Sequence, residues 1–267
     1  MDLFFRRVGQ GTPLIILHGL YGSSDNWLTI ARNLSEQYEV FIPDLRNHGH
    51  SPHHPQHTYP LLCADIIEMM DNNDIEQCVM LGYSMGGKVA MHVAMTVPQR
   101  IKKLIIDDIA PVNYCSSPDF STYGAEHLNI VDTLLNTDLT QYSKREEINE
   151  AWKHSIRDEN VRRFLLKNLQ RGKEDNFNWR INIQAIAHNL PHILNGMNEP
   201  DRGWQIEVPT LFIKGEHSPY ISSTMYPLIR QRFVNYRIAN IPNAGHWVHV
   251  EQPAAFLDEI HQFLTTE

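Results

Sequence analysis

The stretch Val79-Met80-Leu81-Gly82-Tyr83-Ser84-Met85-Gly86-Gly87-Lys88-Val89-Ala90-Met91 decides the fold of this chain. A short apolar run ends at a Gly-x-Ser-x-Gly sequence, and a run with helical character follows at once. This order predicts a strand, a sharp turn and a helix, with Ser84 at the apex. Glycine at positions 82 and 86 avoids a clash between strand and helix, and the strained turn lifts the serine hydroxyl clear of the sheet. The alternative without a functional role is a glycine-rich turn that only connects a strand to a helix.

Composition sets the broad class. Of the 267 residues, 42% are hydrophobic and 20% charged, as in an ordinary globular protein. The formal net charge of -8, with no basic run, argues against a nucleic-acid partner. The sequence has no signal-peptide pattern and no apolar segment long enough for stable insertion in a membrane. Three cysteines without paired spacing suit a reducing compartment. We therefore expect a cytoplasmic protein.

Strands and helices alternate through the first part of the chain, which predicts a mostly parallel α/β sheet covered by helices on both faces. The expected strands are 3–8, 13–17, 38–43, 77–81 and 101–106. Expected helices begin near Ser24 or Asp25, span 58–72, and follow the serine turn.

The alternation then breaks between Pro111 and about Trp204, where we find helical patterns and no strong strand. One of these helices, 181–194, is expected to be interrupted at Pro191. The sheet resumes at 209–213 and 236–241, and a last helix opens at Pro253. The sequence thus predicts a core of residues 1–110 and 205–267 with an inserted helical cap, 111–204.

A serine hydroxyl is a poor nucleophile unless a base takes its proton and a third group holds that base. His246, just past the last strand, is the candidate base, because ligands bind at the carboxyl ends of strands in such sheets. We expect most of the fifteen histidines to have structural rather than catalytic roles. We expect His18 to shape its loop and His249 to be a helix-entry or surface residue. The loop histidines match no zinc spacing; they are His48, His50, His53, His54 and His57.

Four motifs together resemble the α/β-hydrolase family with a helical cap. They are His18-Gly19-Leu20, Asp44-Leu45-Arg46-Asn47-His48-Gly49-His50-Ser51, Gly82-Tyr83-Ser84-Met85-Gly86-Gly87 and Gly245-His246. The likeness covers nearly the whole chain in the family's order. The segments 108–114 and 218–220 are similar to those of YbfF-type bacterial esterases, a group associated with the hydrolysis of acyl-CoA and simple esters.

One departure concerns the acid of the catalytic triad. In most of the superfamily it follows the strand after the cap as Gly-x-x-Asp, whereas this chain reads Gly215-Glu216-His217-Ser218. The resemblance to the YbfF-type group implies Asp108, at the end of the strand after the serine helix. Asp107 and Glu216 remain alternatives, and Asp107 is expected to point to the opposite side of the strand.

The resemblance implies a mechanism in which Ser84 attacks an acyl carbonyl, His246 moves the proton and Asp108 orients the imidazole. Backbone N–H groups of Leu20 and Met85 would form the oxyanion hole. No metal or organic cofactor is expected, the substrate is a small-molecule ester or acyl-CoA, and the protein is a monomer or homodimer. Asp44 and Arg46 are interpreted as structural. The cap aromatics are expected mainly to form the cap's own core, and some could line an acyl pocket; they are Trp152, Phe164, Phe177 and Trp179.

Two alternatives stay open. A carbon–carbon bond hydrolase or a lyase of menaquinone synthesis shares the cap and the serine turn, although Ser218 counts against both. A catalytically silent ligand-binding homologue is the second alternative. A dehalogenase is excluded because it needs aspartate at position 84.

Overall fold

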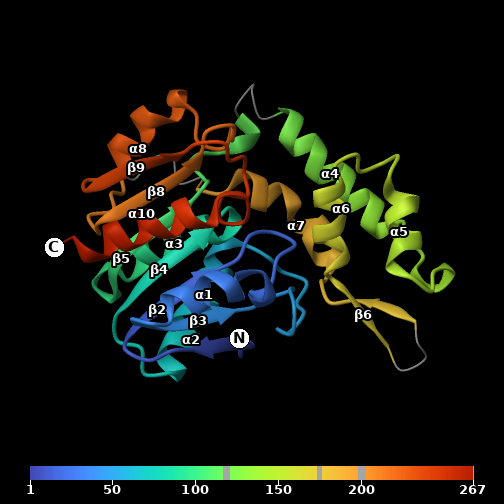
Figure 1. The fold of residues 1–267 in the computed structure, drawn as a ribbon, viewed down its shortest axis with the longest axis horizontal. Helices are drawn as coiled ribbons and strands as arrows, with labels where there is room; N and C mark the ends of the chain where they lie inside the picture. Colours follow the sequence, from blue (N-terminus) through green and yellow to red (C-terminus); the bar gives the residue numbers. More distant parts are fainter. Residues whose placement is uncertain (117–120, 173–175, 198–202, 267) are drawn as a thin grey trace.

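A seven-stranded sheet crosses the computed structural model, which describes residues 1–116, 121–172, 176–197 and 203–266 (Figure 1). The strands lie in the order β1-β3-β2-β4-β5-β8-β9. Only the β1–β3 pairing in this sheet is antiparallel, and the others are parallel, so the predicted mostly parallel sheet is confirmed. The strands are β1 (Phe5–Val8), β2 (Thr12–Leu17), β3 (Tyr38–Pro43), β4 (Cys78–Tyr83), β5 (Ile101–Asp107), β8 (Thr210–Gly215) and β9 (Tyr236–Ile241).

Helices cover both faces of this sheet, as predicted. Alternate residues of β2 enter two separate apolar cores, because successive side chains of a strand point to opposite faces. Leu14 and Ile16 share one core with α1 and α10, while Ile15 and Leu17 share the other with α2, α3 and α8. These helices are α1 (Leu28–Leu34), α2 (Tyr59–Asn72), α3 (Met85–Thr96), α8 (Tyr226–Arg232), α9 (Val248–Glu251) and α10 (Pro253–Thr265).

Between β5 and β8 the chain forms the separate group of helices at the right of Figure 1. It contains α4 (Ser121–Leu135), α5 (Arg145–Trp152), α6 (Glu159–Leu166) and α7 (Ile183–Asn195). It also contains a short antiparallel pair, β6 (Leu169–Arg171) with β7 (Phe177–Trp179), in a region where only helical patterns were expected. Strands of three residues are too short to display an alternating pattern in the sequence.

The expected interruption at Pro191 was wrong. Helix α7 runs through this proline, which lies inside it. The loss of one backbone hydrogen bond is offset because the apolar side chains of Ile186, Leu190 and Ile193 are buried on one face.

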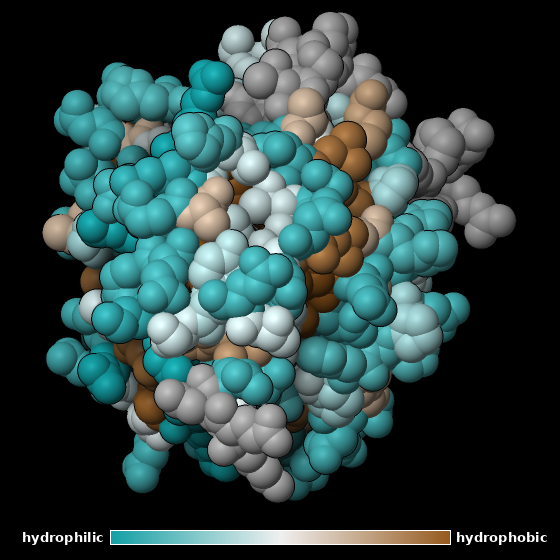
Figure 2. All heavy atoms as spheres, turned by 90° about the vertical axis from the view of Figure 1, so that its right-hand side faces the viewer, coloured by the Kyte–Doolittle hydropathy of each residue, from teal (hydrophilic) through white to brown (hydrophobic). Residues whose placement is uncertain are grey.

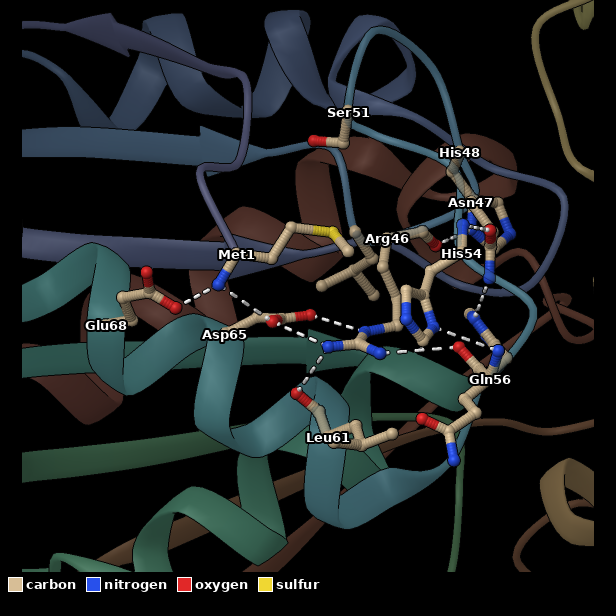
Figure 3. A network of polar contacts seen from close by, with 12 residues as sticks. Met1, Arg46, Asn47, His48, Ser51, His54, Gln56, Leu61, Asp65 and Glu68 are labelled. Carbon is tan, nitrogen blue, oxygen red and sulfur yellow. Dashed lines mark hydrogen bonds and ion pairs between the residues drawn. The ribbon is translucent and has the colours of Figure 1, made fainter.

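The loop after β3 is fixed by buried charges (Figure 3). Arg46 donates to both carboxylate oxygens of Asp65 on α2, at 2.6 and 2.7 Å. Asp44 accepts from the backbone N–H groups of Ser24 at 2.6 Å and His50 at 2.8 Å. Asp44 and Arg46 are both buried. These contacts agree with the structural interpretation of Asp44 and Arg46.

Two histidines lock this loop to the one after β2. His18 Nε2 accepts from the Leu45 N–H at 2.9 Å, and His48 Nε2 accepts from the Tyr21 N–H at 3.2 Å. The other ring nitrogen of each donates to a backbone carbonyl, of Gly19 and Arg46 respectively. Both rings are therefore neutral, and burial lowers the pKa of each. The expectation that His18 shapes its loop agrees with these contacts.

Neutral buried histidines make the protein sensitive to acid. Burial lowers the pKa of His57 to about 3, against about 6.5 in an unfolded chain. The unfolded state thus binds the extra proton first, and stability falls as pH falls through this window. We expect urea unfolding at pH 7 and pH 5 to show a loss of roughly 2 kcal/mol from His57 alone. His57→Gln should reduce the loss between the two pH values, whereas exposed His53→Gln should not. If the two variants lost the same stability between pH 7 and pH 5, the low pKa would not belong to His57.

Within the described ranges, no helix is both long and apolar enough to cross a membrane. The face that carries the helices between β5 and β8 is largely hydrophilic, with a strip of hydrophobic side chains across it (Figure 2).

Candidate active site

Ser84 lies at the tip of a tight turn between β4 and α3. Its backbone has φ 51° and ψ -118°, a strained combination for a residue with a side chain. Glycine is needed on both sides: a Cβ on Gly82 would lie 2.3 Å from the Gly86 carbonyl oxygen, and one on Gly86 would lie 2.3 Å from the Leu17 oxygen. The strand–turn–helix order predicted from the sequence is confirmed.

Three side chains from distant parts of the chain meet at this turn. His246 Nε2 lies 3.2 Å from Ser84 Oγ, and His246 Nδ1 lies 2.7 Å from Asp108 Oδ2. Ser84 follows β4, Asp108 follows β5, and His246 follows β9, so all three lie at carboxyl ends of parallel strands. The His246 side chain is 25% exposed and that of Asp108 is fully buried.

Asp108 is held by the turn after β8. Its Oδ1 accepts from the Gly215 N–H at 3.2 Å, and its Oδ2 accepts from the hydroxyl of Ser218. Ser218 stands where the acid was expected from the superfamily pattern. Its hydroxyl therefore supports a carboxylate that reaches the imidazole from the neighbouring strand.

The two alternative acids contact other groups. Glu216 accepts from the Asn243 N–H at 2.9 Å, and its side chain is 47% exposed. Asp107 Oδ2 lies 2.9 Å from His249 Nδ1, and both side chains are buried. His249 thus lies in the short helix α9 but is not at the surface, because its ring stacks on Trp27 at 4.1 Å.

Burial and the adjacent Asp108 raise the pKa of Asp107, while burial lowers the pKa of His249 to about 3. Both shifts favour the uncharged forms of the two groups. One of the Asp107 oxygens, Oδ1, has no hydrogen-bond partner among the described residues, which an ionised carboxylate would tolerate poorly.

Two residues beside Ser84 have backbone amides without a hydrogen-bond acceptor among the described residues. Met85 is the first residue of α3, whose N–H has no acceptor within the helix. Leu20 follows β2 in the loop held by His18 and His48, and its N–H donates to no acceptor in the described part of the chain. Both residues line a small cavity together with Ser84.

A larger cavity of about 330 Å³ also borders Ser84 and shares Leu20, His127 and Tyr220 with the small one. Helices α4 and α6 contribute Ile130, Val161 and Phe164 to its lining. Of the four aromatics expected mainly in the core of the cap, Trp152 and Phe177 are buried and Trp179 stacks on Trp152. Only Phe164 of these lines the cavity.

Sequence reasoning missed two aromatic residues beside His246. The ring of Tyr220 stacks on that of His246 with centroids 3.8 Å apart. His127 on α4 lines the cavity, and burial lowers its pKa to about 4. The only sequence signal was the likeness of segment 218–220 to the esterase group, and His127 gave none.

The histidine-rich loop forms protein contacts. His48 and His57 are buried, and His57 Nδ1 lies 3.3 Å from Asn47 Nδ2. The residues with described placement contain no group of three His, Cys, Asp or Glu that could hold a metal ion.

Comparison with known proteins gives a consistent result. Residues 12–253 match the family model described as alpha/beta hydrolase fold. "Esterase YbfF" of Escherichia coli is 33% identical over 255 residues, 96% of this chain and 94% of that protein. "sn-1-specific diacylglycerol lipase ABHD11" of Danio rerio is 36% identical, covering 96% and 79% of the two chains. A solved structure titled "Marine microorganism esterase" superposes with a TM-score of 0.92 at 40% identity over 98% of this chain and 99% of that one.

The serine turn, the sheet order, the family model and these relatives all agree, and the chain belongs to the alpha/beta hydrolase family.

Proposed function

We propose that this protein is a serine hydrolase that cleaves carboxylic esters, and acyl-CoA thioesters, through an acyl-enzyme. The observation that carries the proposal is the continuous chain of contacts from Asp108 through His246 to Ser84. Relatives named as an esterase and a lipase support an ester-hydrolysing enzyme.

In the proposed mechanism Asp108 accepts from His246 Nδ1–H and so leaves the Nε2 lone pair directed at the Ser84 hydroxyl. Nε2 takes the proton as Oγ bonds to the substrate carbonyl carbon. The carbonyl oxygen becomes an oxyanion, which the N–H groups of Leu20 and Met85 stabilise. The bond to the alcohol or thiol then breaks, and that leaving group receives the proton from His246. Water, activated by the same imidazole, releases the acid and regenerates Ser84.

We assign the binding of the acyl and alcohol (or thiol) parts of the substrate to the two cavities beside Ser84. Residues 111–204 act as a cap, since α4 and α6 supply much of the apolar wall of the larger cavity. An apolar cleft with few polar groups is the usual form of a small-molecule site.

The test is a panel of p-nitrophenyl esters and acyl-CoA thioesters of increasing chain length, combined with fluorophosphonate labelling. We expect hydrolysis of the esters, and one covalent adduct on Ser84 that blocks it. A chain that binds esters but neither turns them over nor reacts with the probe would be the silent homologue. Cleavage of carbon–carbon bonds in place of esters would contradict the proposal.

A further inference from the structure

Lys88 is a buried lysine one helical turn beyond Ser84. Lys88 is 1% exposed and lies in the mainly apolar helix α3. Nζ donates to the Val112 carbonyl oxygen at 3.0 Å and lies 4.6 Å from the centre of the Tyr114 ring. Burial lowers the pKa of this ammonium to about 7, and the Cys115 thiol acts in the opposite direction.

This lysine lines the small cavity that begins at the nucleophile. The cavity has a volume of about 30 Å³, and its wall includes Ser84, Lys88, Leu20 and Met85. The nucleophile, the two residues assigned to the oxyanion hole and Lys88 therefore border one common space. Since one water needs roughly 10–15 Å³, only a short chain fits.

Among the described residues, the ammonium group has one hydrogen-bond acceptor and two aromatic neighbours, the rings of Tyr114 at 4.6 Å and Tyr59 at 5.8 Å, but no anion. It carries three N–H donors, and the Val112 carbonyl accepts one of them. No carboxylate forms an ion pair with Lys88 among the residues that the structure describes. Buried charges in proteins are normally paired, because an isolated one is costly. A ligand that carries an anion into the cavity would supply the missing partner.

We propose that this cavity holds the acyl part of the substrate and that Lys88 Nζ pairs with a carboxylate at the far end of a short acyl chain. The preferred substrates are then monoesters of small dicarboxylic acids, with the alcohol in the larger cavity. This inference rests on the proposed function, in which Ser84 is the nucleophile. Lys88 acts in recognition and takes no part in the bond-making steps.

The test compares two ethyl esters of the same length. Monoethyl succinate ends in a carboxylate, and ethyl 4-methylpentanoate carries an isopropyl group in its place. We expect the protein to hydrolyse the succinate ester with the higher kcat/KM. Lys88→Met should lower kcat/KM for monoethyl succinate about 10- to 100-fold, mainly through KM, the range typical of one buried charged hydrogen bond. The same variant should leave the neutral ester unchanged or improve it.

Three controls separate recognition from a structural role. Tyr59→Phe removes a neutral hydrogen bond to the Ile193 carbonyl at the same cavity and should affect both esters equally. 3-Acetoxypropanoate carries its carboxylate on the alcohol side and should be indifferent to Lys88→Met. Lys88→Arg retains the charge and should keep part of the preference, which covers the case in which Lys88→Met folds poorly; thermal unfolding checks both variants.

The outcomes are distinct. Equal losses on both ethyl esters in Lys88→Met would make Lys88 a purely structural residue and overturn the inference. Hydrolysis of ethyl 4-methylpentanoate without any preference for monoethyl succinate would overturn it too, while leaving the proposed function intact. Failure to hydrolyse any ester or to react with fluorophosphonate would overturn both.

Discussion

Ser84→Ala is expected to lower kcat for ester hydrolysis by about a million-fold, the scale on which other serine hydrolases lose activity without their nucleophile. The only change is the loss of Oγ, the atom 3.2 Å from His246 Nε2. With no hydroxyl, the acyl-enzyme cannot form and only binding and the oxyanion amides remain.

The fold should survive this change. Ser84 is the N-cap residue of α3, but its side chain makes no capping hydrogen bond, so alanine removes no support from the helix. The measurement is the single-turnover rate with p-nitrophenyl butyrate, beside thermal unfolding. Ser223→Ala, which changes an exposed serine, is the matched control and should behave like the unaltered protein. Activity of Ser84→Ala above one per cent would mean that another group is the nucleophile.

The second large effect is expected at Asp108 and not at its neighbour. Asp108→Asn should lower kcat about ten-thousand-fold, as the corresponding change does in serine proteases. The asparagine side chain carries no charge and can donate its N–H to His246 Nδ1. His246 then carries its own proton on Nε2, so this nitrogen can no longer accept the proton of the Ser84 hydroxyl. KM should change little, because the fully buried side chain does not line either cavity.

Asp107→Asn is the matched control because the two residues are adjacent and equally buried. Burial and Asp108 raise the pKa of Asp107, which favours its uncharged form, and a neutral amide of the same shape can keep the contact with His249 Nδ1. We expect kcat within about tenfold of the unaltered protein, a margin that allows for small shifts in packing. Comparable losses in Asp107→Asn and Asp108→Asn would remove the assignment of Asp108 as the orienting acid.

The sequence was informative where physical constraints are local. The glycines at positions 82 and 86 indicate that backbone atoms approach closely there. Continuous apolar runs indicate strands that are buried on both faces of the sheet. The strand expected at 236–241 is β9, whose pairing with β8 only the structure shows. Because parallel strands end at one edge, the same reasoning also brought residues following β4, β5 and β9 together.

What the sequence could not provide depends on contacts between distant segments. Tyr220 stacks on His246 because Tyr114 accepts from Ala110 N–H and donates to the Tyr220 carbonyl, which joins the turns after β5 and β8. The burial of Lys88 depends likewise on residues 112–114 packing over α3. Helical periodicity describes one helix at a time, and it says nothing about which loop will cover it.

The hydrogen bond between Ser218 and Asp108 has a consequence for how such hydrolases can diverge. β5 and β8 are adjacent and parallel, so side chains just beyond either strand can reach one common point next to the imidazole. A carboxylate and a hydroxyl at these two places can exchange roles without moving the nucleophile or the histidine. Kinship within this superfamily is therefore better judged by where the negative charge sits in space than by which position of the chain supplies it.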